Sequence, residues 1–93
     1  MWEIIERWTN SNRQNLMFRL KNSKTGDKKI CGVAQAAIND YHKTEDTPEQ
    51  AEKNFKEHEE LIIGKAVALI ASGITNDEGY FIVTSQILNA SNI

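Results

Sequence analysis

Residues 47–73 read TPEQAEKNFKEHEELIIGKAVALIASG, and this stretch decides the fold of the chain. It begins like a helix, since Thr47 can cap the free N–H groups, Pro48 suits the first helical position and Gln50 stands three residues after the cap. Apolar residues then recur with the helical period along one stripe: Ala51, Phe55, Ile62, Ala66, Leu69 and Ile70. Gly73 can supply the left-handed residue that ends a helix. We therefore predict one long helix over about residues 47–72, packed on one face of a sheet.

A β-hairpin is predicted before this helix. Its first strand has an apolar face and a mostly cationic face, formed by Leu16, Phe18 and Leu20 on one side and Met17, Arg19 and Lys21 on the other. Residues 22–27 form the turn, where Gly26 is free to take a positive φ, and residues 28–33 return antiparallel to the first strand.

The remaining segments complete an α+β order. Residues 1–9 satisfy neither the strand nor the helix period, so they are a strand or a helical turn, and residues 9–12 favour a turn. We also predict a short helix over residues 34–42 and a buried strand over residues 80–83, which could run parallel or antiparallel to its neighbour. A short turn over residues 85–88 and a frayed tail from residue 89 follow. The prediction is a single α+β domain over residues 1–93 with the order (β)ββααβ and a small antiparallel or mixed sheet.

Size and composition restrict the class of protein. Ninety-three residues are enough for one modest core, and a net charge of −2 predicts no general attraction to nucleic acid or membrane. The longest apolar run, residues 66–71, is far shorter than the roughly 20 residues that span a bilayer. The first residues do not resemble a signal peptide, and the single cysteine fits a reducing compartment. We expect a soluble cytoplasmic protein that does not bind membranes.

Residues along most of the chain resemble a known family. They are Phe18, Gly26, Ile30-Cys31, Ala37-Ile38-Asn39-Asp40, Phe55, His58, Ile62, Ala66 and Gly79. Their order and approximate spacing resemble a family of small bacterial proteins catalogued as a domain of unknown function (family 1488). The family pattern carries an arginine just after the His58 position, where this chain has Glu59, so no shared anion site is carried over. The resemblance implies a compact α+β fold and no activity.

The sequence signals for catalytic or metal-binding residues are weak. Cys31 lies mid-strand, where cysteine usually packs as a small hydrophobic residue, although Lys28 and Lys29 are near. His42 and His58 could bind a metal with Asp40 or Glu45, but the zinc spacings are missing, and we expect His58 to be a hydrogen-bonded residue at the boundary of the stripe.

The carboxylates offer no better catalyst. Candidates for acid–base catalysis are Asp40, Glu57, Glu59 and Glu60. We expect Glu52, Glu59 and Glu60 to face water, where a carboxylate contributes little to catalysis. The sequence therefore predicts no catalytic residues, no metal, no cofactor and no enzymatic activity.

The uneven distribution of basic and acidic residues along the chain is its most informative feature. Six basic residues stand against one acid between Arg13 and Lys29, whereas seven acids stand against two lysines between Glu45 and Glu60. The leading prediction is a non-enzymatic binding or adaptor domain that associates with protein or with itself, because a basic patch on one copy can meet an acidic patch on another.

Two alternatives stay open for the same charges. The first is weak binding of nucleic acid or phosphate by the hairpin residues Arg19, Lys21, Lys24, Lys28 and Lys29. It is disfavoured by a pI near 5.6 and by the expectation that no aromatic residue lies on the outward face. The second is a mobile-element inhibitor that acts by occlusion. A solvating role for the charges, with lysines that protect a strand edge, is the simplest interpretation.

Overall fold

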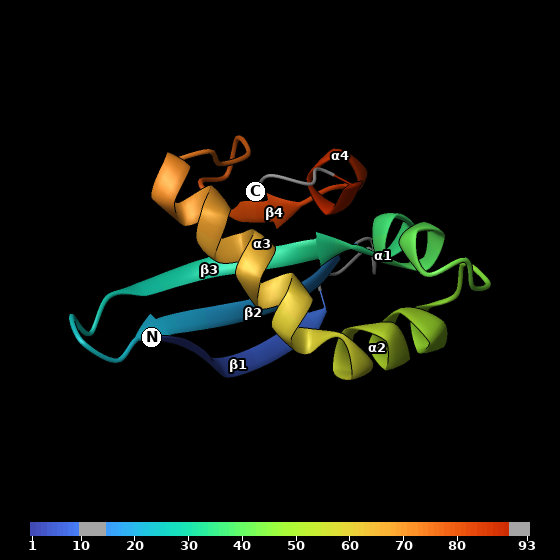
Figure 1. Ribbon diagram of the computed structural model, residues 1–93, viewed down its shortest axis with the longest axis horizontal. Helices are drawn as coiled ribbons and strands as arrows, with labels where there is room; N and C mark the ends of the chain where they lie inside the picture. Colours follow the sequence, from blue (N-terminus) through green and yellow to red (C-terminus); the bar gives the residue numbers. More distant parts are fainter. Residues whose placement is uncertain (10–14, 90–93) are drawn as a thin grey trace.

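A four-stranded sheet and four helices make up this protein in a computed structural model, which describes residues 1–9 and 15–89. The elements are β1 (Trp2–Thr9), β2 (Asn15–Asn22), β3 (Lys28–Ala34), α1 (Gln35–Tyr41), α2 (Pro48–Glu57), α3 (Glu59–Ser72), β4 (Phe81–Val83) and α4 (Ser85–Asn89), shown in Figure 1. The predicted turn at residues 10–12 and the predicted tail from residue 90 lie outside the described residues.

The strands lie side by side in the order β1-β2-β3-β4. The first three form an antiparallel meander, in which Phe18 of β2 faces Cys31 of β3. β4 pairs with β3 in parallel, with α1, α2 and α3 forming the connection between them (Figure 1). The α+β fold class and the N-terminal hairpin are confirmed, and the direction of the last strand, which the sequence leaves open, is parallel.

β1 contains a β-bulge, which explains its unclear periodicity. Ile4 pairs with Leu20 and Glu6 pairs with Arg19, so Ile5 is an extra residue with no partner in β2. A bulge shifts the alternation of side chains by one residue. Trp2 and Ile4 therefore share the sheet face of Leu20, whereas Trp8, which pairs with Met17, lies on the opposite face.

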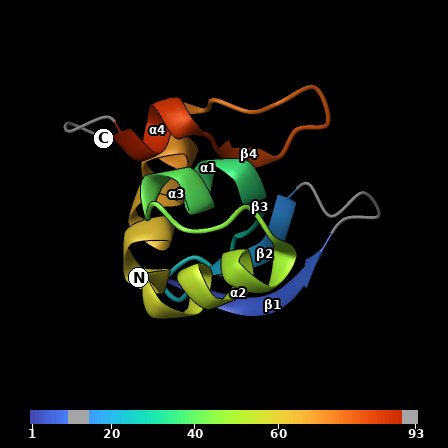
Figure 2. The same ribbon diagram turned by 90° about the vertical axis from the view of Figure 1, so that its right-hand side faces the viewer.

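The core lies between one face of the sheet and the helices. Leu16, Phe18 and Leu20 of β2 are buried together with residues of β3, β4 and all four helices. Phe18 meets Phe55 of α2 edge to face, with ring centroids 5.2 Å apart. Figure 2 shows the helices on one side of the sheet, as the apolar stripe predicts. No helix in the described part of the chain is both long enough and apolar enough to cross a membrane.

The predicted long helix is two helices, and this is a correction to the sequence analysis. Its ends are as predicted: Thr47 Oγ1 accepts the Gln50 N–H at 3.1 Å, and Gly73 ends α3 with a φ of 70°. Between them His58 leaves the helical conformation, with φ −124° and ψ 32°, and α2 and α3 run in different directions (Figure 1). The bend lets Phe55 and Ile62 both pack on a twisted sheet, and an apolar stripe does not show it, because residues on both sides of a bend still face the core.

A buried polar network, which no local sequence pattern indicates, holds α1 against α2. Asn39 and Asn54 are 1% and 3% exposed. Asn54 Nδ2 donates to Asn39 Oδ1 at 3.0 Å and to Thr44 Oγ1 at 2.8 Å, while Asn39 Nδ2 donates to the Thr47 carbonyl at 3.1 Å. When the nitrogen and the oxygen of a buried side-chain amide are both hydrogen-bonded, the amide fixes one arrangement of the segments that it joins, here α1 and α2. The network thus places the start of α2 relative to the sheet.

Candidate functional site

β1 forms an open edge of the sheet. No strand within residues 1–9 and 15–89 pairs with its outer side. Half of the backbone N–H and C=O groups of such a strand point away from the sheet, where another strand can bind them. Two large apolar side chains on it are exposed, Ile5 by 45% and Trp8 by 36%. The edge therefore offers both hydrogen-bonding groups and apolar surface.

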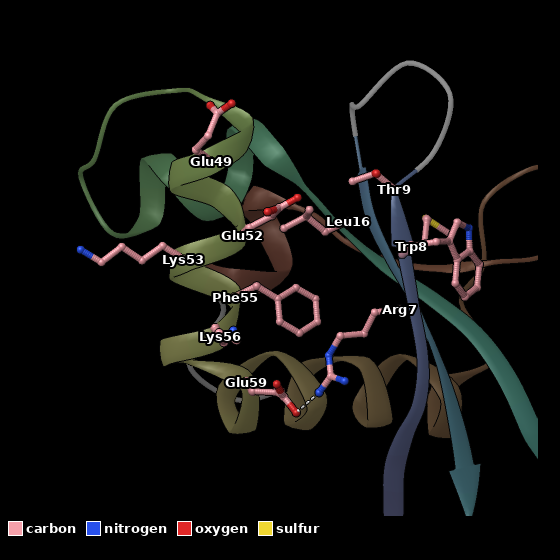
Figure 3. Close-up of a pocket in the computed structure, with 11 residues that line it drawn as sticks. Arg7, Trp8, Thr9, Leu16, Glu49, Glu52, Lys53, Phe55, Lys56 and Glu59 are labelled. Carbon is pink, nitrogen blue, oxygen red and sulfur yellow. Dashed lines mark hydrogen bonds and ion pairs between the residues drawn. The ribbon is translucent and has the colours of Figure 1, made fainter.

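A groove lies beside the Thr9 end of this strand, between the sheet and α2 (Figure 3). Its volume is about 710 Å³. Glu52 and Phe55 point into it from α2, and Leu16 and Thr9 face them from the sheet, whereas Lys53 points away (Figure 3). The groove has an apolar floor and an acidic side chain on its helical wall, and it is open to solvent.

An ion pair crosses from the edge strand to the start of α3. Arg7 lies on the helix-facing side of β1, opposite Phe18, and its Nη2 donates to Glu59 Oε1 at 2.7 Å. The sequence predicts that Glu59 faces water, and this holds only in part: its side chain is 30% exposed and is paired with Arg7 of β1. The pair joins the open edge to the helix layer.

The outer face of the sheet carries a tryptophan among cations. The Arg19 guanidinium lies over the Trp8 ring, 5.9 Å from its centroid, and Arg19 Nη1 is 2.9 Å from Glu6 Oε1. The expectation that no aromatic residue lies on the outward face is wrong, because the bulge at Ile5 rotates Trp8 onto that face. Glu6 also reduces the positive charge there.

The five predicted binding residues do not form one surface. The register places Arg19, Lys21 and Lys28 on the outer face. Lys29 pairs with Leu20 and lies on the helix-facing side, and Lys24 is in the turn between β2 and β3. Glu3 is directly opposite Lys21. β1, whose pairing the sequence leaves undecided, thus interleaves acids with the cations of the outer face. The sixth basic residue of the region, Arg13, lies outside the described residues.

The two histidines meet at the break between α2 and α3. Their rings stack with centroids 3.9 Å apart and an angle of 15°. His42 Nε2 is buried without a hydrogen-bond partner in the described structure, and His58 is exposed. The expected boundary hydrogen bond of His58 is replaced by this stacking. Desolvation by burial, with the nearby His58, lowers the pKa of His42, although Glu57 acts in the opposite direction.

Neither metal nor thiol chemistry gains support from the geometry. Within the described part of the chain, no three His, Cys, Asp or Glu side chains come together as a metal site. Cys31 is fully buried in the core, and desolvation raises its pKa to about 12. Its thiol therefore stays protonated and packs as an apolar group.

Comparisons with known proteins show the fold. No family profile and no curated protein matches this chain. A solved structure does match, described as a protein of unknown function from the DUF1488 family from Shewanella loihica PV-4. The TM-score is 0.74 at 18% identity, over 89% of this chain and 91% of the other. The chain has a DUF1488-type fold. The predicted resemblance to family 1488 is thereby confirmed at the level of the fold.

The open edge and its groove are what sequence reasoning missed within this DUF1488-type fold. Two tryptophans in the first eight residues indicate that the segment packs on the core. That signal does not reveal that the segment is an edge strand or that Trp8 points outward. Both depend on which strand it pairs with and on where the bulge falls.

Proposed function

We propose that this chain is a non-enzymatic binding domain that works by associating with protein, and first of all with itself, through the open edge of β1. The observation that carries the proposal is the exposure of Ile5 and Trp8 on an eight-residue edge strand. Proteins usually protect such edges, because a row of free backbone groups with apolar side chains invites another strand. A partner that pairs with β1 would bury both.

The division of charge supports the same proposal. The end of the hairpin formed by β2 and β3 is basic, because Lys21, Lys24, Lys28 and Lys29 stand there against Asp27. The exposed residues of α2 are weakly acidic, with Glu49, Glu52 and Glu57 against Lys53 and Lys56. Opposite charges on distant parts of one small surface favour association between copies and speed their encounter. The buried, protonated thiol of Cys31 is consistent with a cytoplasmic location, where no disulfide is required.

Sedimentation equilibrium of the purified chain, at about 0.05 M and about 0.5 M salt, tests this proposal. We expect an average mass above the 10.6 kDa of one chain, rising with protein concentration. Association should weaken at the higher salt, because screening reduces the attraction between exposed charges. A mass of one chain at every concentration and both salts contradicts self-association.

Weak binding of nucleic acid or phosphate stays a second candidate because of Trp8. An aromatic ring beside Arg19, with Lys21 and Lys28 on the same face, is the combination on which bases stack and phosphates bind. The acids Glu3 and Glu6 on that face argue against it, as does the acidic pI near 5.6. The inhibitor role stays a prediction that rests on size and charge alone.

A further inference from the structure

We propose that β1 pairs antiparallel with the β1 of a second copy about a twofold axis near Ile5, so that the turn between β2 and β3 of each copy contacts α2 of the other. The inference rests on the proposed function and names its partner and geometry. The product is a closed dimer with a continuous eight-stranded sheet.

The exposed apolar residues point to this axis. Of the five large apolar side chains most exposed in the described residues, Met1, Ile5 and Trp8 lie on β1 or directly before it. Ile5 stands near the middle of the eight-residue strand. Antiparallel pairing of two identical strands places the middle residue of each beside that of the other, because the twofold axis passes through the centre of the pair. Ile5 of one copy is thus covered by Ile5 of the other.

The two ends of β1 lie beside different charges. At its first end, Trp2 pairs with Asn22 and the Ser23 N–H donates to the Met1 carbonyl at 2.8 Å, so this end lies next to the hairpin end where Lys21, Lys24, Lys28 and Lys29 stand against Asp27. At its last end, Thr9 lines the groove together with Glu49 and Glu52 of α2. Antiparallel pairing brings the first end of one strand to the last end of the other. The basic hairpin end of each copy therefore faces the start of α2 in its partner, where Glu49 and Glu52 are exposed.

The charged side chains at these two places are available for the contact. Lys24 is exposed in the turn, and Lys29, two residues beyond the turn on the helix-facing side of β3, is half-buried. Glu49 and Glu52 are exposed on α2. The ion pairs found in the described residues, Arg7–Glu59 and Arg19–Glu6, use none of these four. Because the axis repeats the contact, each dimer gains two sets of opposite charges.

The helix layer does not extend over the corner of the sheet that would face α2 of the partner (Figure 1). A twofold axis between antiparallel strands of one sheet is normal to the sheet, so both helix layers lie on the same side. Figure 1 shows α3 crossing the sheet diagonally, from the end of β1 near α2 toward β4. The corner over the start of β1 and the turn carries no helix in that view (Figure 1). The rotation brings α2 of the partner beside this corner.

The apolar contact is tested with Ile5→Asp and a matched control, Ile74→Asp. Ile74 is 55% exposed and lies outside β1, so it matches Ile5 in chemistry and exposure. We expect Ile5→Asp to weaken the dimer at least about tenfold in sedimentation equilibrium, whereas Ile74→Asp leaves it unchanged. Thermal unfolding checks that both variants fold. Oxidation of Ile5→Cys should also give a covalent dimer, while the buried native Cys31 does not react.

The charge contact is tested by exchange between copies. Lys24→Glu with Lys29→Glu, and separately Glu49→Lys with Glu52→Lys, should each weaken the dimer about tenfold, because both contacts then bring like charges together. A mixture of the two variants should restore the dimer, since each of its two contacts again joins opposite charges. Exchange of this kind does not restore an interface built from other residues.

The outcomes separate this inference from the proposed function. A dimer that persists in Ile5→Asp, or that the mixture fails to restore, overturns the β1 pairing and leaves self-association standing through another surface. A wild-type chain that is monomeric throughout overturns both, and assigns the bulge and the charges of β1 to protection of the edge. Weakening by each change with recovery in the mixture supports the inference.

Discussion

Phe55 is the residue through which α2 holds the sheet. Its ring meets Phe18 edge to face and is 6% exposed. We predict that Phe55→Ala lowers the free energy of unfolding by about 3–5 kcal/mol, and that Ile62→Ala, which empties a fully buried site on α3, lowers it by about 2–5 kcal/mol. Urea unfolding measures both. Glu60→Ala, at an exposed position of α3, is the control, and unfolding of the two core variants at the wild-type midpoint contradicts the placement of both helices.

His42 makes stability depend on pH. Burial, with the stacked His58 beside it, lowers the pKa of His42 below its ordinary value of 6.5. The unfolded chain therefore takes up a proton at a higher pH than the folded chain. The contribution of His42 to stability is complete above this ordinary value and is lost as the pH falls through the lower folded value.

Urea unfolding at about pH 7.5 and about pH 5 measures this contribution. We expect His42→Phe to show a smaller loss of stability between the two conditions than the wild type, because a phenyl ring stacks without titrating. Carboxylates that do not interact with position 42 contribute to both proteins equally, so the difference reports on His42 together with its neighbours His58 and Glu57. Equal losses in wild type and variant contradict the assignment.

Two glycines in different elements are predicted to respond oppositely to the same change. Gly64 is exposed within α3, and a Cβ there meets nothing within 4 Å, so Gly64→Ala should raise the free energy of unfolding by about 0.5–1 kcal/mol. A Cβ on Gly32 of β3 would lie 2.7 Å from Met17 Sδ and 3.3 Å from the Leu16 carbonyl oxygen. Gly32→Ala should therefore be destabilising by about 1–3 kcal/mol. Thermal unfolding compares the two variants. A loss of stability in Gly64→Ala contradicts the placement of Gly64 in the interior of a helix.

At the scale of the whole molecule, the distribution of charge leads us to predict weak or no binding of nucleic acid. Arg19 and Lys21 lie on the outer face opposite Glu6 and Glu3, so with Lys28 this face carries three cations against two acids. We expect no retarded band with single- or double-stranded nucleic acid at physiological ionic strength. If a band appears and Arg19→Glu with Lys21→Glu abolishes it while the fold is retained, the nucleic-acid candidate replaces the proposed function.

The sequence by itself determined the elements whose signals are local. These signals act within a few residues, and they predict a hairpin, helices and an α+β class. They are the capping residue Thr47, the left-handed Gly73, the alternation around Phe18 and the turn at Gly26. The apolar stripe likewise predicts which side of α2 and α3 is buried, because a helix must cover its apolar face.

The tertiary structure alone decided the features that depend on contacts between distant segments. His58 interrupts a continuous apolar stripe, the outward turn of Trp8 follows a bulge defined by β2, and Glu59 finds its partner 52 residues away in Arg7. The open edge also belongs to this class, because a strand is an edge only through the absence of a neighbour. For that physical reason the candidate site, unlike the fold class, could not be predicted from local sequence.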